Sequence, residues 1–203
     1  MCGFDDFLAR LASDSVFVHA LFNRLLKFQK VILRGYYGAV GEYIHLTTSG
    51  DDFGTQSGPF MSPRMFRTLV LPYLRERIAY TRQFTSGYFW HHTCGSVFSL
   101  LPDLIEAGVD ILNPIQPGAL QMEPERLKAE YGSQLCFHGG FDTQGVLPFG
   151  TPKTIADEVQ RVIEAMKPNG GYIFSAAHNI QSDVSAANVL AMYQSAFDLG
   201  RYA

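Results

Sequence analysis

The sequence predicts an α/β fold built on a parallel sheet, and three observations carry that prediction. From residue 43 onward, segments rich in β-branched and aromatic residues alternate with amphipathic segments five times. Such alternation is typical of parallel strands connected by helices. Polar side chains gather just after the expected strands, where parallel sheets place their ligand sites. An initial helical segment precedes the five strand–helix units.

Length and composition indicate an ordinary globular domain. The chain has 203 residues, of which 47% are hydrophobic and 17% charged, with a net charge of −3. This length supports one substantial core, so we expect residues 1–203 to form a single domain. The charge balance, without any Lys/Arg-rich run, argues against nucleic acid as a partner. Polar residues interrupt the apolar stretches, which argues against a membrane span.

The cysteines bear on the cellular compartment. Cys2, Cys94 and Cys136 are few, odd in number and widely spaced. This pattern favours free thiols, or thiols used for metal or redox chemistry, over a disulfide framework. The first residues lack the basic segment and apolar run of a secretory signal. A cytoplasmic protein is therefore expected.

The first elements are helical. Apolar residues recur every three or four positions over residues 14–40, which predicts a long amphipathic helix, with a shorter one near residues 4–11. Residues 43–48 then read as a buried strand, with His45 in its middle.

A loop over residues 50–59 leads to a helix that begins at Ser62-Pro63 and runs to about residue 84. Serine is a good N-cap and proline a good first helical residue, whereas Pro72 should kink or break the helix. Four arginines are expected on the solvated face of this helix: Arg64, Arg67, Arg75 and Arg77.

The remaining chain alternates regularly. Residues 43–203 give about 32 residues for each of five units, so a closed barrel of eight would need roughly 256. The sheet is therefore either open or the C-terminal part of a barrel. The expected strands and helices are, in order, residues 88–92, 97–107, 109–113, 124–131, 135–138, 152–166, 172–175 and 186–200.

His92-x-Cys94 closes the expected strand at 88–92. Side chains two positions apart on a strand point to the same side, so the imidazole and the thiol face one pocket. The spacing suits two ligands of one zinc ion, and a catalytic zinc takes three protein ligands and keeps one position open. A structural role stays open as well, because buried cysteine is more often a packing residue.

Asp51 and Asp52 follow the first expected strand. Two carboxylates in this position can act as acid and base, hold a cation, or orient a ligand imidazole. Neighbours on an extended chain face opposite ways, so at most one should point inward. The alternative is an Asx turn before Gly54.

Five motifs, in order, cover essentially the whole chain: GDDFGTQSGP at 50–59, HTCGS at 92–96, EAGVDILNP at 106–114, GGFDTQ at 139–144 and HNIQSDV at 178–184. Together they resemble the uroporphyrinogen decarboxylase superfamily. The resemblance implies a (β/α)8 TIM barrel that is incomplete here, with about five C-terminal β/α units and the N-terminal barrel strands missing. It also implies one of two chemistries: metal-free decarboxylation of uroporphyrinogen, or zinc-dependent methyl transfer between corrinoid proteins and thiols.

The methyltransferase branch is the first hypothesis. There the resemblance implies zinc held by His92 and Cys94, with a third ligand after the last strand, where this chain has His178 instead of the usual cysteine. The zinc would bind a small thiol, and a corrinoid protein would donate the methyl group. Asp51 and Asp52 are then the catalytic candidates, and Gln56 and His178 the candidates for substrate contact.

Two further hypotheses stay open. A cofactor-free decarboxylase of porphyrin biosynthesis would use His178 to contact a tetrapyrrole, but it needs inward arginines that the expected strand ends do not supply. An inactive or partner-dependent barrel fragment would expose an open edge at residues 43–48. The resemblance also implies a homodimer. Whether this chain is an enzyme by itself is left open.

Overall fold

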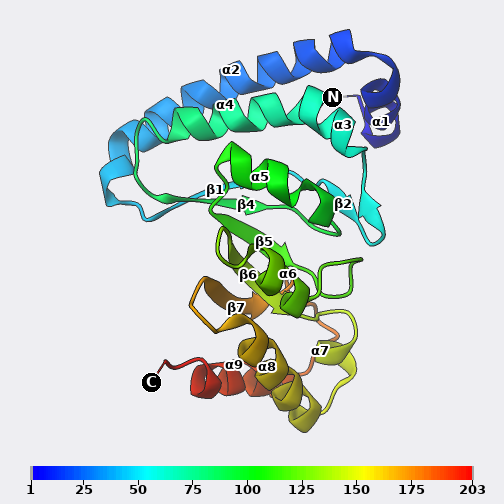
Figure 1. Ribbon diagram of the computed structural model, residues 1–203, viewed down its shortest axis with the longest axis vertical. Helices are drawn as coiled ribbons and strands as arrows, with labels where there is room; N and C mark the ends of the chain where they lie inside the picture. The colour runs from blue at the N-terminus through cyan, green and yellow to red at the C-terminus, as the bar shows by residue number, and fades with distance from the viewer. Residues whose placement is uncertain (1, 203) are drawn as a thin grey trace. The chain divides into compact units, whose positions relative to one another are not determined.

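The computed structural model describes residues 2–202, which group into two compact units (Figure 1). The first unit comprises residues 2–49, 61–90 and 99–109, and the second comprises residues 50–60, 91–98 and 110–202. Every residue singled out above as a candidate for the site belongs to the second unit.

The first unit is mainly helical. α1 (Phe4–Ser13) leads into α2 (Ser15–Val40), whose first turn is capped by the Asp14 carboxylate accepting the N–H of Phe17 at 3.0 Å. This capping satisfies an N–H that would otherwise lack a partner at the helix start. α2 lies alongside α4 (Leu71–Thr81) in Figure 1. Both predicted N-terminal helices are confirmed.

The helix expected from Ser62 is interrupted near Pro72, as predicted. α3 (Pro63–Met65) passes into a π-helical turn, η2 (Phe66–Val70), and α4 begins at Leu71, one residue before the proline. Proline has no N–H to donate to the carbonyl four residues earlier, so the regular ladder cannot continue through it. The widened turn lies just before this missing donor.

The four arginines of this helical segment divide into two kinds. Arg64, Arg67 and Arg75 are exposed, as predicted. Arg77 is half-buried and donates to the Ser49 hydroxyl at 3.3 Å, so its assignment to the solvated face was wrong. The remaining helix of this unit, α5 (Leu101–Ala107), follows a short 3-10 turn, η3 (Phe98–Leu100).

Five strands form one sheet, which confirms the predicted α/β class. The strand order is β1-β4-β5-β6-β7, and the pairs β5-β6 and β6-β7 are parallel. The bounds are β1 (Leu46–Gly50), β4 (Tyr88–His92), β5 (Ile111–Ile115), β6 (Cys136–Phe141) and β7 (Tyr172–Ala176).

The first strand differs from its prediction. Residues Gly41–Tyr43 form a 3-10 turn, η1, that prolongs α2, so β1 starts only at Leu46. His45 precedes the strand and is exposed, and Thr47 alone is buried within β1. The buried-strand prediction was therefore wrong. Among the described residues β1 stands at the end of the strand order, next to β4, and the residues that form it are mostly small or polar.

The predicted loop after β1 contains a small hairpin. β2 (Gly54–Thr55) pairs antiparallel with β3 (Gly58–Pro59). The Thr55 hydroxyl donates to the carbonyl oxygen of Gly58 at 2.9 Å, which closes the turn. Strands of two residues give no periodic signal, so only the loop was predictable.

Four helices of the described chain belong to the second unit; α8 packs against β6, and the other three contact α8. They are α6 (Pro124–Tyr131), α7 (Val146–Phe149), α8 (Pro152–Met166) and α9 (Ala186–Leu199). α8 and α9 lie side by side, and the core between them and the sheet includes Phe141, Ile155, Val159 and Met192. α7 was not predicted, whereas α6, α8 and α9 agree with their predictions to within one residue.

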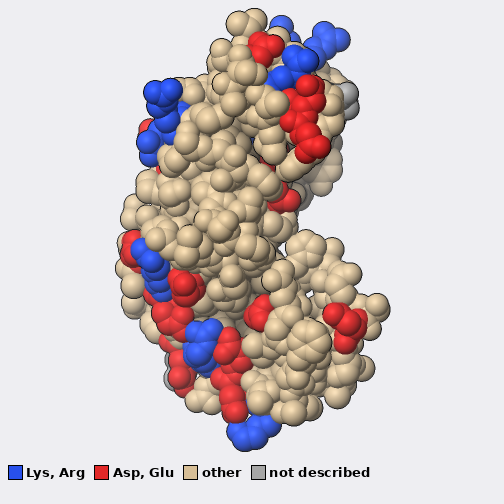
Figure 2. Space-filling model, turned by 90° about the vertical axis from the view of Figure 1, so that its right-hand side faces the viewer, with Lys and Arg blue, Asp and Glu red and all other residues tan. Residues whose placement is uncertain are grey.

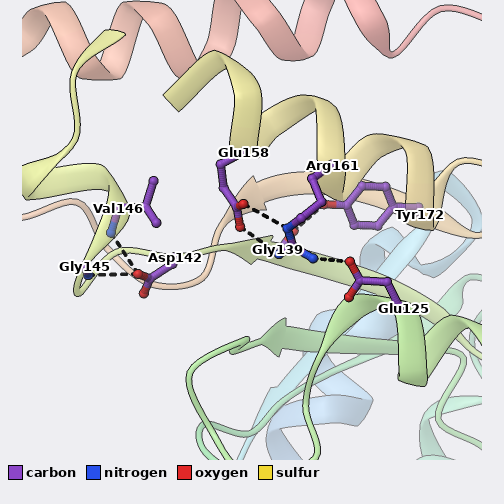
Figure 3. A network of polar contacts seen from close by, with 8 residues as sticks. All are labelled: Glu125, Gly139, Asp142, Gly145, Val146, Glu158, Arg161 and Tyr172. Carbon is purple, nitrogen blue, oxygen red and sulfur yellow. Dashed lines mark hydrogen bonds and ion pairs between the residues drawn. The ribbon is translucent and has the colours of Figure 1, made fainter. Parts of the chain in front are cut away.

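The carboxyl end of β6 is fixed by polar contacts (Figure 3). The Asp142 carboxylate accepts the N–H groups of Gln144, Gly145 and Val146 at 2.8 to 3.0 Å. The hydroxyl of the half-buried Tyr172 donates to the Gly139 carbonyl at 2.7 Å, and desolvation raises the pKa of this phenol. Because its oxygens are occupied by backbone donors, Asp142 serves the turn that starts α7.

Ion pairs connect neighbouring helices on the surface of the second unit. Arg161 on α8 binds Glu158 on the same helix and Glu125 on α6 (Figure 3). On the face shown in Figure 2, acidic and basic side chains lie in mixed groups. Within residues 2–202, no helix is both long enough and apolar enough to cross a bilayer.

Asn188 on α9 should contribute measurably to stability. This side chain is 5% exposed, and its amide nitrogen donates to the carbonyl oxygens of Leu147 and Gly150, both at 2.9 Å. Asn188→Ala removes both donors, so we expect a loss of about 2–3 kcal/mol in the free energy of unfolding, measured by urea denaturation. The exposed Asn179→Ala is the control and should change it by less than about 0.5 kcal/mol. Equal stability of the two variants would contradict this account of α9.

Candidate metal centre

The site is built where two loops run side by side. The segment after β1 and the segment after β4 are joined by three hydrogen bonds that involve the backbone. Because residues of both segments are held in register, side chains far apart in the sequence come together at this point. The bonds run from Asp51 N to His92 O (3.0 Å), from Phe53 N to Thr93 Oγ1 (2.9 Å) and from Ser96 N to Thr55 O (2.7 Å).

Two glycines allow the loops to approach this closely. A Cβ atom on Gly54 would lie 2.7 Å from the Cys94 carbonyl oxygen, and one on Gly95 would lie 2.5 Å from the Gly54 carbonyl carbon. Gly95 also has a φ of 78°, a conformation that other residues adopt only with strain. Any larger residue at either position would push the loops apart.

His92 is held in one orientation by Asn113 on β5. The imidazole Nδ1 lies 2.8 Å from the Asn113 side-chain oxygen, and because an amide oxygen only accepts, Nδ1 carries the proton. Nε2 is then the nitrogen with a lone pair in the neutral ring, and it lies 3.4 Å from Cys94 Sγ. Histidines that bind a metal through one ring nitrogen commonly donate a hydrogen bond from the other nitrogen to an oxygen, which fixes the ring in this way.

Asp52 completes a group of three metal-binding donors with His92 and Cys94. The donor atoms lie within 4.8 Å of one another, and Asp52 Oδ1 is 3.7 Å from His92 Nε2. A tetrahedral zinc ion with ordinary bond lengths sets nitrogen and sulfur ligands about 3.5 Å apart, close to the 3.4 Å found here. The donors therefore fit a single ion of this size.

The environment of Cys94 opposes the thiolate while no cation is bound. Burial first, and then the negative charge and the hydrogen bond of Asp52, raise the pKa of the Cys94 thiol to about 11. The same Asp52 Oδ1 accepts the backbone N–H of Cys94 at 2.9 Å. A cation bound at this position would offset the repulsion between the negative charges of the thiolate and the carboxylate.

The remaining candidate residues take different places. Asp51 contributes its backbone N–H to the loop pairing, and Asp52 is the member of the carboxylate pair that joins the donor group; both residues are exposed. His178 follows β7 and is exposed; its ring centre lies 6.5 Å from that of His92. Its role as a ligand stays a prediction, as does the role of Gln56 in substrate contact.

A hollow of about 440 Å³ adjoins the thiol. Many of the residues that line it have uncharged side chains capable of hydrogen bonding. Gln116 is fixed there because its side-chain oxygen accepts the N–H of Gly95 at 3.0 Å. The side chains that line it include Gln56, Cys94, Gln116, Thr143, Gln144 and His178.

Asn113 and Gln116 were missed by sequence reasoning. Asn113 is the middle residue of β5, which lies next to β4 in the sheet, and Gln116 follows the last residue of β5, so a strand-end position could have pointed to Gln116 only. The prediction ended that strand at residue 113, two residues before its observed end, and so made Asn113 the last residue of the strand.

The five-stranded sheet, with the candidate donors near the carboxyl ends of β1 and β4, is of the α/β type from which β/α barrels are built. The uroporphyrinogen decarboxylase (URO-D) family model matches residues 1–198, so the chain belongs to that family. A methyltransferase from Methanosarcina mazei has a similar structure, with a TM-score of 0.75 and 16% identity over 97% of this chain and 54% of that one. This likeness supports the predicted barrel fold.

Curated relatives are similar at low identity. A uroporphyrinogen decarboxylase from Xylella fastidiosa is 28% identical over 154 residues, which cover 71% of this chain and 41% of that protein. Another, from Vesicomyosocius okutanii, is 32% identical over 68 residues, covering 34% of this chain and 19% of that protein. The chain thus spans less than half the length of the curated relatives it matches.

The raised pKa of Cys94 predicts a pH profile for its alkylation. In metal-free protein the rate of reaction with iodoacetamide should climb with pH up to about 11, because the thiolate is the reacting form. Asp52→Asn removes a negative charge that disfavours the thiolate, so it should shift the profile to lower pH. Mass spectrometry of the Cys94 peptide measures this, with the Cys136 peptide as internal control. An unshifted profile in the variant would show that Asp52 does not act on the thiol.

Proposed function

We propose that this protein holds a zinc ion through His92 and Cys94 and uses it to activate a small thiol, which accepts a methyl group from a corrinoid protein. The observation that carries the proposal is the orientation of His92: Asn113 binds Nδ1 at 2.8 Å and so directs the Nε2 lone pair toward Cys94. A histidine that only packed in the core would not need a lone pair facing a thiol and a carboxylate.

The residues of the site have separate tasks in this proposal. His92 and Cys94 supply nitrogen and sulfur donors, a combination that zinc binds readily. When bound, zinc lowers the pKa of a coordinated thiol and keeps it as thiolate near neutral pH. Gln56, Gln116 and Gln144 line the adjoining hollow, and their carboxamides would hold the rest of the thiol compound by hydrogen bonds.

The comparisons agree with this proposal in part. The structural neighbour from Methanosarcina mazei is described as a methyltransferase, although 16% identity relates the folds alone. The chain spans about half of that protein, so a corrinoid partner and much of the substrate site would involve parts of a complete barrel that this chain does not contain.

Decarboxylation of a tetrapyrrole is the second candidate, favoured by the names of the curated relatives. In this case no metal is needed, and His178 would contact the substrate. A tetrapyrrole with several carboxylates calls for cationic partners, whereas the hollow beside Cys94 is lined by amide, hydroxyl, thiol and imidazole groups. The donor group of Asp52, His92 and Cys94 would then have no task.

Replacing Cys94 separates the two candidates. Cys94→Ser should reduce zinc affinity by more than about 100-fold, measured by equilibrium dialysis, because a ligand is lost and not merely a residue that orients one. Transfer of a methyl group from methylcobalamin to a test thiol such as 2-mercaptoethanol should fall with it. Cys136→Ser is the matched control and should keep both properties. Full zinc binding by Cys94→Ser, or decarboxylation of uroporphyrinogen by the chain, would refute the methyltransferase proposal.

A homodimer, or dependence on a partner, is proposed on different grounds. Leu190, Tyr193 and Phe197 lie on one face of α9 and are 71%, 49% and 61% exposed. Large apolar side chains at helical spacing usually contact another surface.

Light scattering tests this surface. The chain alone should self-associate at high concentration, and a Leu190→Gln, Phe197→Gln double variant should have a lower average mass. Val16→Gln, at a similarly exposed apolar residue on α2, is the control. A wild-type chain that stays monomeric at high concentration would contradict the proposal.

A further inference from the structure

We infer that Asp52 supplies the third protein ligand of the metal held by His92 and Cys94, and that His178 does not bind it. This inference rests on the proposed metal-dependent function and makes it more specific. It assigns a bound carboxylate where a thiolate or an imidazole would otherwise complete the ligand set.

Position favours Asp52 over His178. Asp52 Oδ1 lies 3.7 Å from His92 Nε2 and within 4.8 Å of Cys94 Sγ, so all three donors can meet one ion. Among residues 2–202 the donor atoms that lie within 4.8 Å of one another are those of Asp52, His92 and Cys94, and His178 is not part of this group. His178 remains next to the hollow, where a substrate would meet it.

The backbone holds Asp52 in place. Its Oδ1 accepts the N–H of Cys94 at 2.9 Å, so one ligand is hydrogen-bonded to the main chain of another. The paired loops fix the approach further, because Gly54 and Gly95 allow the two backbones to touch. A carboxylate has about four acceptor positions, so this bond leaves room for a metal. Asp52 is 56% exposed, which leaves that side of the group accessible.

Charge also favours Asp52. A divalent ion with one thiolate, one carboxylate and one imidazole is electrically neutral, whereas one thiolate with two imidazoles leaves a charge of about +1. The carboxylate thus supplies the second negative charge that the chain lacks after β7, where Ala177 and His178 stand. Oxygen is a harder donor than sulfur, so this set leaves the ion more electron-poor than a set with two thiolates.

The test is a titration of the metal-free chain with Co²⁺, followed by the visible absorption of tetrahedral cobalt and by the thiolate-to-cobalt charge-transfer band. Wild type should bind one ion. Asp52→Asn should weaken binding by about 10-fold or more. Asparagine keeps the oxygen that accepts the Cys94 N–H, so this variant removes the charge and spares the hydrogen bond.

Matched variants decide the assignment. Asp51→Asn removes the neighbouring carboxylate, and His178→Ala removes the competing imidazole; both should bind Co²⁺ like wild type. Asp52→Cys should restore binding and strengthen the charge-transfer band through a second thiolate. Urea midpoints close to wild type exclude unfolding as the cause of any loss.

The outcomes separate this inference from the proposal beneath it. Unchanged affinity in Asp52→Asn would overturn the role of Asp52, and loss of binding in His178→Ala would overturn the exclusion of His178, while zinc binding by His92 and Cys94 stood in either case. A wild-type chain with no charge-transfer band at any Co²⁺ concentration would overturn the proposed function itself.

Discussion

The candidate site depends on one interaction, the backbone pairing of the loop after β1 with the loop after β4. Three hydrogen bonds align residues 51–55 with residues 92–96, and a fourth joins the Asp52 carboxylate to the N–H of Cys94. The Gly54–Gly95 contact sets how closely the loops lie. Since backbone hydrogen bonds fix both position and direction, the donor atoms meet without any of them having to be buried.

Polar residues in the second unit fall into two groups that their hydrogen bonds distinguish. Asp142 accepts three backbone N–H groups, and Asn188 donates to two carbonyls, so both are occupied by the fold. Asp52 accepts one backbone N–H and keeps further acceptor positions beside a thiol and an imidazole. A carboxylate at a strand end therefore suggests chemistry only after its backbone partners have been counted.

Much of the fold and two of the three members of the donor group could be predicted from the sequence. Helical and strand periodicity located α2, β4, α6 and α8 closely, and the alternation along β4 placed His92 and Cys94 on one side. The position of His45 could not be predicted, because composition does not reveal that a helix continues as a 3-10 turn. The pairing of Asp52 with Cys94 depends on loop register, which carries no periodic signal.

The positions of the site residues along the chain have an evolutionary consequence. The donors and the groups that orient them, from Asp52 to Asn113, lie in one stretch of the sequence, whereas Thr143, Gln144 and His178 reach the hollow from later strand ends. Substitutions in the later loops can alter the shape and polarity of the hollow while the ion-binding atoms keep their places. Selection could thus redirect this scaffold to a new acceptor molecule in small steps, each of which retains the reactive centre.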